Sequence, residues 1–363
     1  MKIDRLEVSS FTVPTEAPES DGTLRWDRTT LVLVETTAGG ETGIGYTYAH
    51  RAAATLIRDK LAELITERDP LDIPAAWQAM RREVRNLGAC GIAAMAISAV
   101  DHSLWDLKAR LLGLPLVKLL GACRGGMPIY GSGGFTSYDD EQLARQLGGW
   151  VDAGISRVKM KVGREPERDP ERVRVARQAI GDDAELFVDA NSAYDRKQAL
   201  HFMHWFAGES DVRWIEQPLP PEDRCGMRFL RRHSPPELEI TDGEYAWGPA
   251  DIREMIDADE VDVVMADATR CGGVSGFMKI AALCEAHRLP LSAHCAPLLH
   301  LHPGCAAAPL RHAEYFHDHV RIERLFFDGF PDPVDGALHP DPSTPGLGVT
   351  FKTADAEPYR DNP

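Results

Sequence analysis

Short strand-like runs alternate with helix-like segments over the middle of the chain. Eight runs rich in apolar and β-branched residues lie at 128–133, 156–162, 185–189, 213–216, 238–241, 261–266, 290–294 and 312–316. Alternation of this kind predicts a parallel sheet, and eight units over roughly 190 residues favour a closed barrel. A doubly wound open sheet is the alternative, but no GxGxxG motif follows a first strand.

Ionisable residues recur with the same period and close or follow these runs. They are Lys161, Asp189, Glu216, Glu244, Asp267, His294 and Glu314, with successive gaps of 28, 27, 28, 23, 27 and 20 residues. Because a barrel places the ends of its strands on one face, where its active site lies, these side chains are expected to converge. Three carboxylates flanked by a lysine and a histidine would bind a divalent cation and move protons.

The first part of the chain has an α+β pattern instead. Residues 2–12 and 29–37 are predicted to be strands, and the polar segment 15–28 between them to be a mobile loop. Helical spacing of apolar residues predicts helices over 51–67, 74–85 and 90–112. The Pro-, Asp- and Gly-rich tail, 326–363, shows no clear eighth helix and is expected to return to the N-terminal region as a partial cap.

Charge and cysteine content limit the possible partners. The net charge of −16 argues against non-specific binding to nucleic acid, and no apolar run approaches the roughly 18–20 residues needed to span a membrane. The N-terminus lacks the apolar stretch of a signal peptide, and the seven cysteines form no CxxC pair. We therefore expect reduced thiols in a cytoplasmic protein with neither a nucleic-acid nor a membrane partner.

Asp189, Glu216 and Glu244 are the candidate metal ligands. Hard carboxylate oxygens suit Mg²⁺, which keeps open positions for water or substrate oxygens. Any one of these carboxylates could instead cap the next helix, but three in register favour a metal site. Asp242 competes with Glu244, since residues two apart in a strand share a face.

The remaining ionisable residues suggest proton transfer. Lys159 and Lys161 lie two apart in an apolar strand and are expected to share a face, either as a functional pair or snorkelling to a barrel end. Asp267 and His294 close neighbouring runs and could form an acid/base dyad. Glu314 could donate a hydrogen bond to an oxyanion, or form a surface ion pair.

Motifs along nearly the whole chain resemble the enolase superfamily, and within it the mandelate racemase group. They include VKMKVG (158–163), FVDAN (187–191), WIEQP (214–218), TDGEYAWGP (241–249), MADATRCGGVSGF (265–277), SAHC (292–295) and HAEYF (312–316). AVDHSLWDLKARLLGLPLVKLLG (99–121) and PGLGV (345–349) also match.

The resemblance implies a fold and a domain division. The expected fold is an α/β, modified (β/α)₇β TIM barrel with an N-terminal α+β capping domain completed by the C-terminal tail. The implied domains are the cap at 1–125, the barrel at 126–325 and the returning segment at 326–363. Barrels of this type are commonly symmetric assemblies, so we expect a homo-oligomer.

The resemblance also implies roles for the residues. Mg²⁺ would be held by Asp189, Glu216 and Glu244, a choice that prefers Glu244 over Asp242. Lys161 would be a base on one face of the substrate with Lys159 as its electrostatic neighbour, and His294, oriented by Asp267, would act on the other. Glu314 would stabilise the enolate, with Asn191 beside it. Arg270 stands where muconate-lactonising relatives carry a catalytic lysine, which places the chain with the mandelate racemase type.

The implied reaction is abstraction of the α-proton of a carboxylate substrate. Dehydration of an acid sugar to a 2-keto-3-deoxy acid is favoured because it is frequent among relatives of this type. Racemisation or epimerisation of a 2-hydroxy acid or acid sugar is the alternative, and a catalytically inactive ligand-binding barrel is a more remote one. Candidates for contact with the distal end of the substrate come from segments 14–28 and 45–50, although ordinary cap packing is the alternative for each: Arg25, Trp26, Tyr46, Tyr48 and His50.

Overall fold

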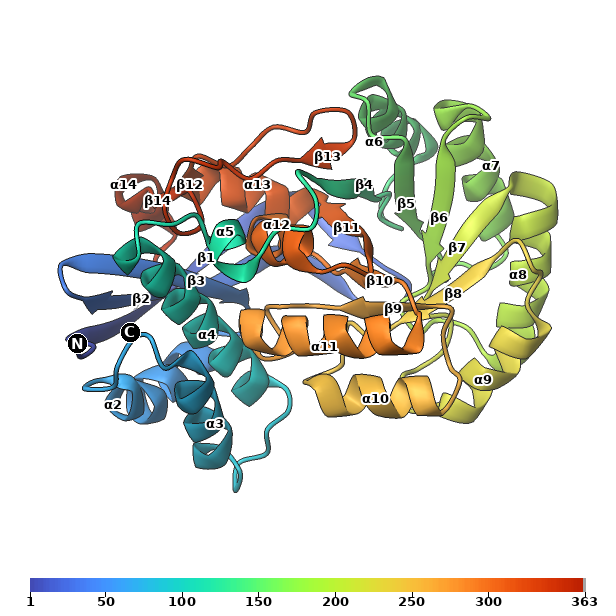
Figure 1. Ribbon diagram of the computed structural model, residues 1–363. Helices are drawn as coiled ribbons and strands as arrows, with labels where there is room; N and C mark the ends of the chain where they lie inside the picture. The colour runs from blue at the N-terminus through green and yellow to red at the C-terminus, as the bar shows by residue number, and fades with distance from the viewer. Residues whose placement is uncertain (362–363) are drawn as a thin grey trace.

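A closed barrel of eight parallel strands forms the larger part of the molecule (Figure 1). The computed structural model describes residues 1–361. Each strand pairs with the next along the chain, and the eighth pairs with the first, so the barrel has no free edge. The strands are β4 (Met127–Gly133), β5 (Arg157–Lys161), β6 (Glu185–Asp189), β7 (Val212–Glu216), β8 (Glu239–Asp242), β9 (Val263–Ala266), β10 (Leu291–Ala293) and β11 (Leu310–Phe316).

Helices follow the barrel strands and cover their outer faces. They are α6 (Asp140–Asp152), α7 (Asp169–Ile180), α8 (Arg196–Ser210), α9 (Arg224–His233), α10 (Pro249–Asp257), α11 (Gly273–His287), α12 (Pro297–Ala306) and α13 (His317–Phe326). Asp139 and Asp195 begin α6 and α8 as N-caps, each in a capping box with a glutamine three residues later. Their apolar faces and the outward side chains of the strands form one continuous core.

The N-terminal residues form the expected α+β domain. Three antiparallel strands, β1 (Arg5–Ser20), β2 (Arg25–Ala38) and β3 (Glu41–Tyr48), pack against α4 (Ile92–Leu111). The third strand was not predicted. The remaining elements of this part are α1 (Ala52–Leu56), the π-helical turn η1 (Ile57–Leu61), α2 (Ala62–Ile65), α3 (Ile73–Glu83) and α5 (Leu116–Leu120).

Residues 15–28 are not the mobile loop that their polar composition predicts. They complete β1 and begin β2, and Glu19 and Ser20 pair with Trp26 and Arg25. The tip of this hairpin docks on the barrel, where Ser20 contacts Thr136 at 2.7 Å. The prediction was wrong because these polar groups are satisfied by distant barrel loops, which no local pattern reveals.

Gly22 allows this docking. A β-carbon at residue 22 would lie 2.4 Å from the carbonyl oxygen of Ala190 and 2.7 Å from that of Val162. Only glycine permits such a close approach of the hairpin to the loops after β5 and β6.

The chain after β11 returns to the capping domain. Ile322 and Phe326 of α13, a helix not anticipated from the sequence, share a core cluster with Phe11 and Leu31 of the N-terminal sheet. Buried Asp318 and Glu323 interrupt the apolar stripe of α13. The periodicity of apolar residues therefore does not predict this helix.

The tail has only short elements: β12 (Phe327–Asp328), β13 (Ala337–Leu338), β14 (Thr350–Phe351), α14 (Thr353–Ala356) and the 3₁₀ turn η2 (Glu357–Tyr359). Leu347 and Val349 of the tail join the same core cluster. We propose a domain division at 1–125, 126–325 and 326–363. Within residues 1–361, no helix is long and apolar enough to cross a membrane, and all seven cysteines are free.

Candidate active site

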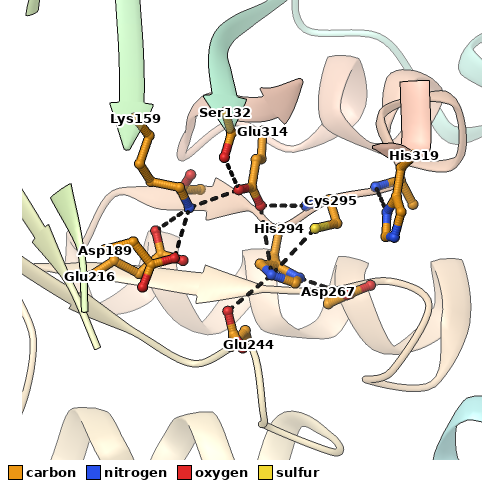
Figure 2. Close-up of polar contacts among 12 residues, drawn as sticks. Ser132, Lys159, Asp189, Glu216, Glu244, Asp267, His294, Cys295, Glu314 and His319 are labelled. Carbon is orange, nitrogen blue, oxygen red and sulfur yellow. Dashed lines mark hydrogen bonds and ion pairs between the residues drawn. The ribbon is translucent and has the colours of Figure 1, made fainter. Parts of the chain in front are cut away.

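The register of the barrel brings the periodic ionisable residues into one layer. Lys161, Asp189 and Glu216 are aligned across β5, β6 and β7. Ala266, Ala293 and Ala313 are aligned across β9, β10 and β11, so the residues that follow them, Asp267, His294 and Glu314, also lie side by side. Figure 2 shows most of these side chains pointing toward a common centre at the carboxyl ends of the strands. The predicted convergence is therefore observed.

Lys159 lies one layer below this ring and links three carboxylates. Its Nζ atom is 2.6 Å from Glu216 Oε2, 2.8 Å from Glu314 Oε1 and 3.5 Å from Asp189 Oδ2 (Figure 2). Burial opposes the charge of the ammonium group, but Glu216 and Glu314 raise the pKa of Lys159 well above its ordinary value. Lys159 is thus a fixed positive charge rather than a group that snorkels to solvent.

Lys161 reaches the cavity above Lys159. Its Nζ atom lies 2.5 Å from Asp189 Oδ2. Burial favours the neutral amine, but Asp189 holds the pKa of Lys161 above its ordinary value. Positive charge near Asp189 would lower that pKa and make the amine a better base.

Asp267 and His294 form the predicted dyad. Asp267 Oδ2 lies 2.8 Å from His294 Nδ1, and Glu244 Oε2 lies 3.0 Å from Nε2 (Figure 2). Burial favours the neutral ring, but these carboxylates and Glu314 raise the pKa of His294 well above its ordinary value. The dyad carboxylate fixes Nδ1 as a donor, so Nε2 is the nitrogen that faces the cavity.

Arg270 contacts both acidic partners of His294, which sequence analysis did not foresee. Its Nη1 lies 3.7 Å from Glu244 Oε1, and its Nε lies 3.4 Å from Asp267 Oδ2. Its guanidinium also lies over the ring of Tyr245. At the position where the resemblance implies a catalytic lysine in muconate-lactonising enzymes, this chain therefore has a cation held by two carboxylates.

The structure distinguishes Glu244 from Asp242. Strand β8 ends at Asp242, and Gly243 with a φ of 131° breaks the alternation that would place the two carboxylates on one face. Glu244 turns toward His294, whereas Asp242 lines a separate cavity near α9 and α10.

Glu314 accepts hydrogen bonds on both oxygens. Ser132 Oγ donates to Oε1 at 2.6 Å, and the backbone N–H of Cys295 donates to Oε2 at 2.9 Å (Figure 2). Although burial opposes its charge, Lys159 and His294 hold the pKa of Glu314 well below its ordinary value. Glu314 is a carboxylate here and must gain a proton before it can donate to an oxyanion.

The carboxylates at the centre fit a hard divalent cation. Glu216 Oε1 is buried and has no hydrogen-bond partner within residues 1–361. Oxygens of Glu216 and Glu244 lie within 4.8 Å of each other, close enough to share an ion. Burial and the neighbouring Asp189 raise the pKa of Glu216 to about 8, which a bound cation would relieve.

A cavity of about 740 Å³ opens above these residues, between the barrel and the capping domain. Of the predicted substrate contacts, Trp26, His50 and Asn191 line it. Asn191 also donates its backbone N–H to Asp189 at 3.0 Å. Tyr48, which the sequence analysis named as a candidate, also lines the cavity, together with His319, for which no role was predicted.

Two of the residues predicted to contact the substrate do not line this cavity. Arg25 is exposed on the hairpin and is not among the residues that line the cavity. Tyr46 is fully buried, and its hydroxyl donates to Glu323 at 2.6 Å. Side chains alternate along β3, so Tyr46 and Tyr48 share one face of the strand and Thr47 points to the other. Tyr48 lines the cavity, whereas Tyr46 lies deeper, between the sheet and α13.

Comparison with known proteins agrees with this geometry. Residues 142–356 match the family model described as enolase C-terminal domain-like, and residues 6–121 match the mandelate racemase / muconate lactonizing enzyme N-terminal domain. The chain belongs to the enolase superfamily, in its mandelate racemase group. It is therefore an enolase-superfamily enzyme with the two-domain fold of that family.

Relatives within the superfamily act on several substrates. L-talarate/galactarate dehydratase of Salmonella typhimurium is 33% identical over 85% of this chain and 80% of its own length. Others are named 3,6-anhydro-alpha-L-galactonate cycloisomerase, L-rhamnonate dehydratase and D-gluconate dehydratase.

Solved structures in the superfamily are similar over almost the entire chain. A mandelate racemase/muconate lactonizing enzyme-like protein from Rubrobacter xylanophilus is 52% identical, with a TM-score of 0.97, covering 99% of this chain and 100% of its own. A Streptomyces coelicolor racemase solved with bound magnesium is 28% identical, with a TM-score of 0.93 and coverage of 99% and 100%. Superfamily members use Mg²⁺, which is the cofactor of this enzyme.

Proposed function

We propose that this enzyme dehydrates an acid sugar to a 2-keto-3-deoxy acid through an enolate. The observation that carries the proposal is the pairing of two proton-transfer groups, Lys161 and the Asp267–His294 dyad, on the wall of one cavity above buried carboxylates. A barrel that only binds a ligand has no need of two such groups.

Asp189, Glu216 and Glu244 would hold the magnesium ion. When bound, it supplies positive charge for the substrate carboxylate and for the negative charge that develops on the enolate. Lys159 lies beneath and compensates the charge of Glu216 and Glu314.

Lys161 or His294 would remove the α-proton, depending on the configuration of the substrate. The electron pair of the broken C–H bond forms the enolate, and Glu314, once protonated, hydrogen-bonds its oxygen. The opposite group then protonates the departing β-hydroxyl, which leaves as water. The resulting enol tautomerises to the 2-keto acid.

Racemisation or epimerisation is the second candidate, because two opposed groups also suit proton delivery to the other face. A structurally similar protein is described as a racemase. The two reactions share proton abstraction and differ only in the fate of the enolate.

Deuterium exchange separates these functions. The Mg²⁺-loaded enzyme is incubated in D₂O with galactarate, D-gluconate, L-rhamnonate, D-arabinonate and mandelate, and proton NMR follows α-exchange and keto-acid formation. Keto acid supports dehydration, whereas exchange with inversion and without keto acid supports racemisation. No exchange with any of these acids would contradict both.

Two variants test the residues. Lys161→Ala and His294→Asn should abolish turnover and leave the circular dichroism spectrum unchanged. Full activity in both variants would refute the assignment.

A further inference from the structure

Residues 295 and 296, which follow shortly after β10, have a strained backbone. Cys295 and Ala296 have φ angles of 52° and 39°, in the left-handed region that non-glycine residues rarely adopt. Such strain persists only where neighbouring groups over-determine the conformation, and it is concentrated at functional sites. Here the backbone N–H of Cys295 donates to Glu314.

His319 holds the next peptide. The backbone N–H of Ala296 donates to His319 Nδ1 at 3.2 Å. The imidazole of His319 is stacked on Tyr48, with ring centroids 3.4 Å apart, and meets the ring of Phe316 edge-on. These contacts fix its position and its orientation.

The same contact determines the tautomer of His319. Because Nδ1 accepts a hydrogen bond from the backbone N–H of Ala296, the hydrogen of the neutral ring must be on Nε2. Burial lowers the pKa of His319 to about 3, so the ring is neutral near neutral pH. His319 therefore presents one Nε2–H donor.

That donor faces the cavity. His319 lines the cavity with His294 and Tyr48. Its Nε2 atom makes no hydrogen bond within residues 1–361. Unlike Nε2 of His312, which is fully enclosed and has no partner, Nε2 of His319 keeps some accessible surface. His319 comes five residues after Glu314, in the first turn of α13 just beyond the end of β11, and is thus separate from the residues proposed to move protons.

We propose that His319 is a specificity-determining residue whose Nε2–H donates to an oxygen that the substrate carries beyond its α-carbon. This proposal rests on the proposed function and specifies its substrate class. The enzyme selects polyhydroxylated acids over 2-hydroxy acids with a hydrocarbon side chain. A site built to hydrogen-bond a hydroxyl discriminates strongly against ligands that lack it, because its own donor is then left unpaired.

Two substitutions separate this role from support of the backbone. In His319→Asn, the amide oxygen can occupy the Nδ1 position and still accept from Ala296, while the Nε2–H donor is lost. In His319→Gln, the longer side chain places its amide near Nε2, so a donor to the cavity remains.

Binding is measured by calorimetry with Mg²⁺ present, in a Lys161→Ala background that prevents turnover. The ligands are galactarate, D-gluconate, L-rhamnonate and D-arabinonate, with mandelate as the ligand that has no oxygen beyond the α-carbon. We expect His319→Asn to weaken binding of at least one sugar acid by roughly tenfold or more, the value of one hydrogen bond, and to leave mandelate binding unchanged. His319→Gln should recover much of the lost affinity.

Equal weakening of sugar acids and mandelate would show a structural role only and would overturn the inference. Unchanged binding of every sugar acid in His319→Asn would overturn it as well. In both cases α-exchange by the wild-type enzyme would leave the proposed function standing. If no sugar acid binds and none is exchanged, both proposals fail together.

Discussion

Lys159 Nζ lies 2.6 Å from Glu216 Oε2, and neither side chain has any exposed surface. The ammonium group also contacts Glu314, so a single cation compensates two buried carboxylates. Buried charges of this kind are tolerated only in pairs, since each alone would carry a large desolvation penalty.

Replacing Lys159 by methionine should therefore destabilise the fold. The change leaves Glu216 and Glu314 without their cation, and we expect a loss of about 3–5 kcal/mol in the free energy of unfolding in urea. Added Mg²⁺ should restore part of this loss, because it supplies positive charge to the same carboxylates. Arg145→Met, which removes an exposed ion pair with Glu141, is the control and should change stability little. Equal stability of the Lys159 variant and the control would contradict the prediction.

Glu244 and Asp242 should differ in their effect on the metal. Glu244→Gln removes a carboxylate that faces His294, and we expect the affinity for Mg²⁺ in calorimetric titration to fall at least about tenfold. Asp242→Asn, whose carboxylate lines another cavity, should bind Mg²⁺ like the wild type. A loss of affinity confined to Asp242→Asn would reverse the ligand assignment.

Gly22→Ala should undock the hairpin tip from the barrel mouth. The added methyl group would meet two carbonyl oxygens at 2.4 and 2.7 Å, so the hairpin that carries Trp26 must move. Displacement of a cavity wall should lower kcat/KM roughly 10- to 100-fold for the substrate found by deuterium exchange. Gly149→Ala, in α6 with open space around it, is the matched control. A Gly22 variant that keeps wild-type kcat/KM would show that the docked hairpin is dispensable.

Glu323 should make stability depend on pH. Burial raises the pKa of this carboxyl group, which accepts from Tyr46, from 4.5 to about 8. A raised folded-state pKa contributes stability that is fully present below the unfolded-state pKa and is lost as the pH rises through the folded-state value. Between pH 5 and 8 the free energy of unfolding of the wild type should thus fall, by a few kcal/mol at most, relative to Glu323→Gln.

Urea titrations of both proteins at several pH values measure this difference. As the pH rises from 5 to 8, the free energy of unfolding of Glu323→Gln should increase relative to that of the wild type. A difference that is constant from pH 5 to 8 would show that the carboxyl group does not titrate in this range.

The periodic pattern alone determined the barrel and most of its site. Strand ends of a parallel barrel must lie on one face, so the spacing of Lys161, Asp189, Glu216, Asp267, His294 and Glu314 was sufficient to predict that they converge. Local sequence also predicted the helical stretches 51–67, 74–85 and 90–112 of the capping domain, because their apolar residues recur with helical spacing.

Only the tertiary structure decided the rest. Glu244 and Asp242 could be distinguished only when Gly243 was seen to break β8, since the alternation of side chains holds only within a strand. Residues 15–28 form a docked hairpin because barrel loops more than 100 residues away satisfy their polar groups. Likewise, nothing near His319 in the sequence indicates that Ala296 fixes its tautomer. Sequence periodicity therefore determined which residues meet, and long-range packing decided which way each side chain and each hydrogen bond points.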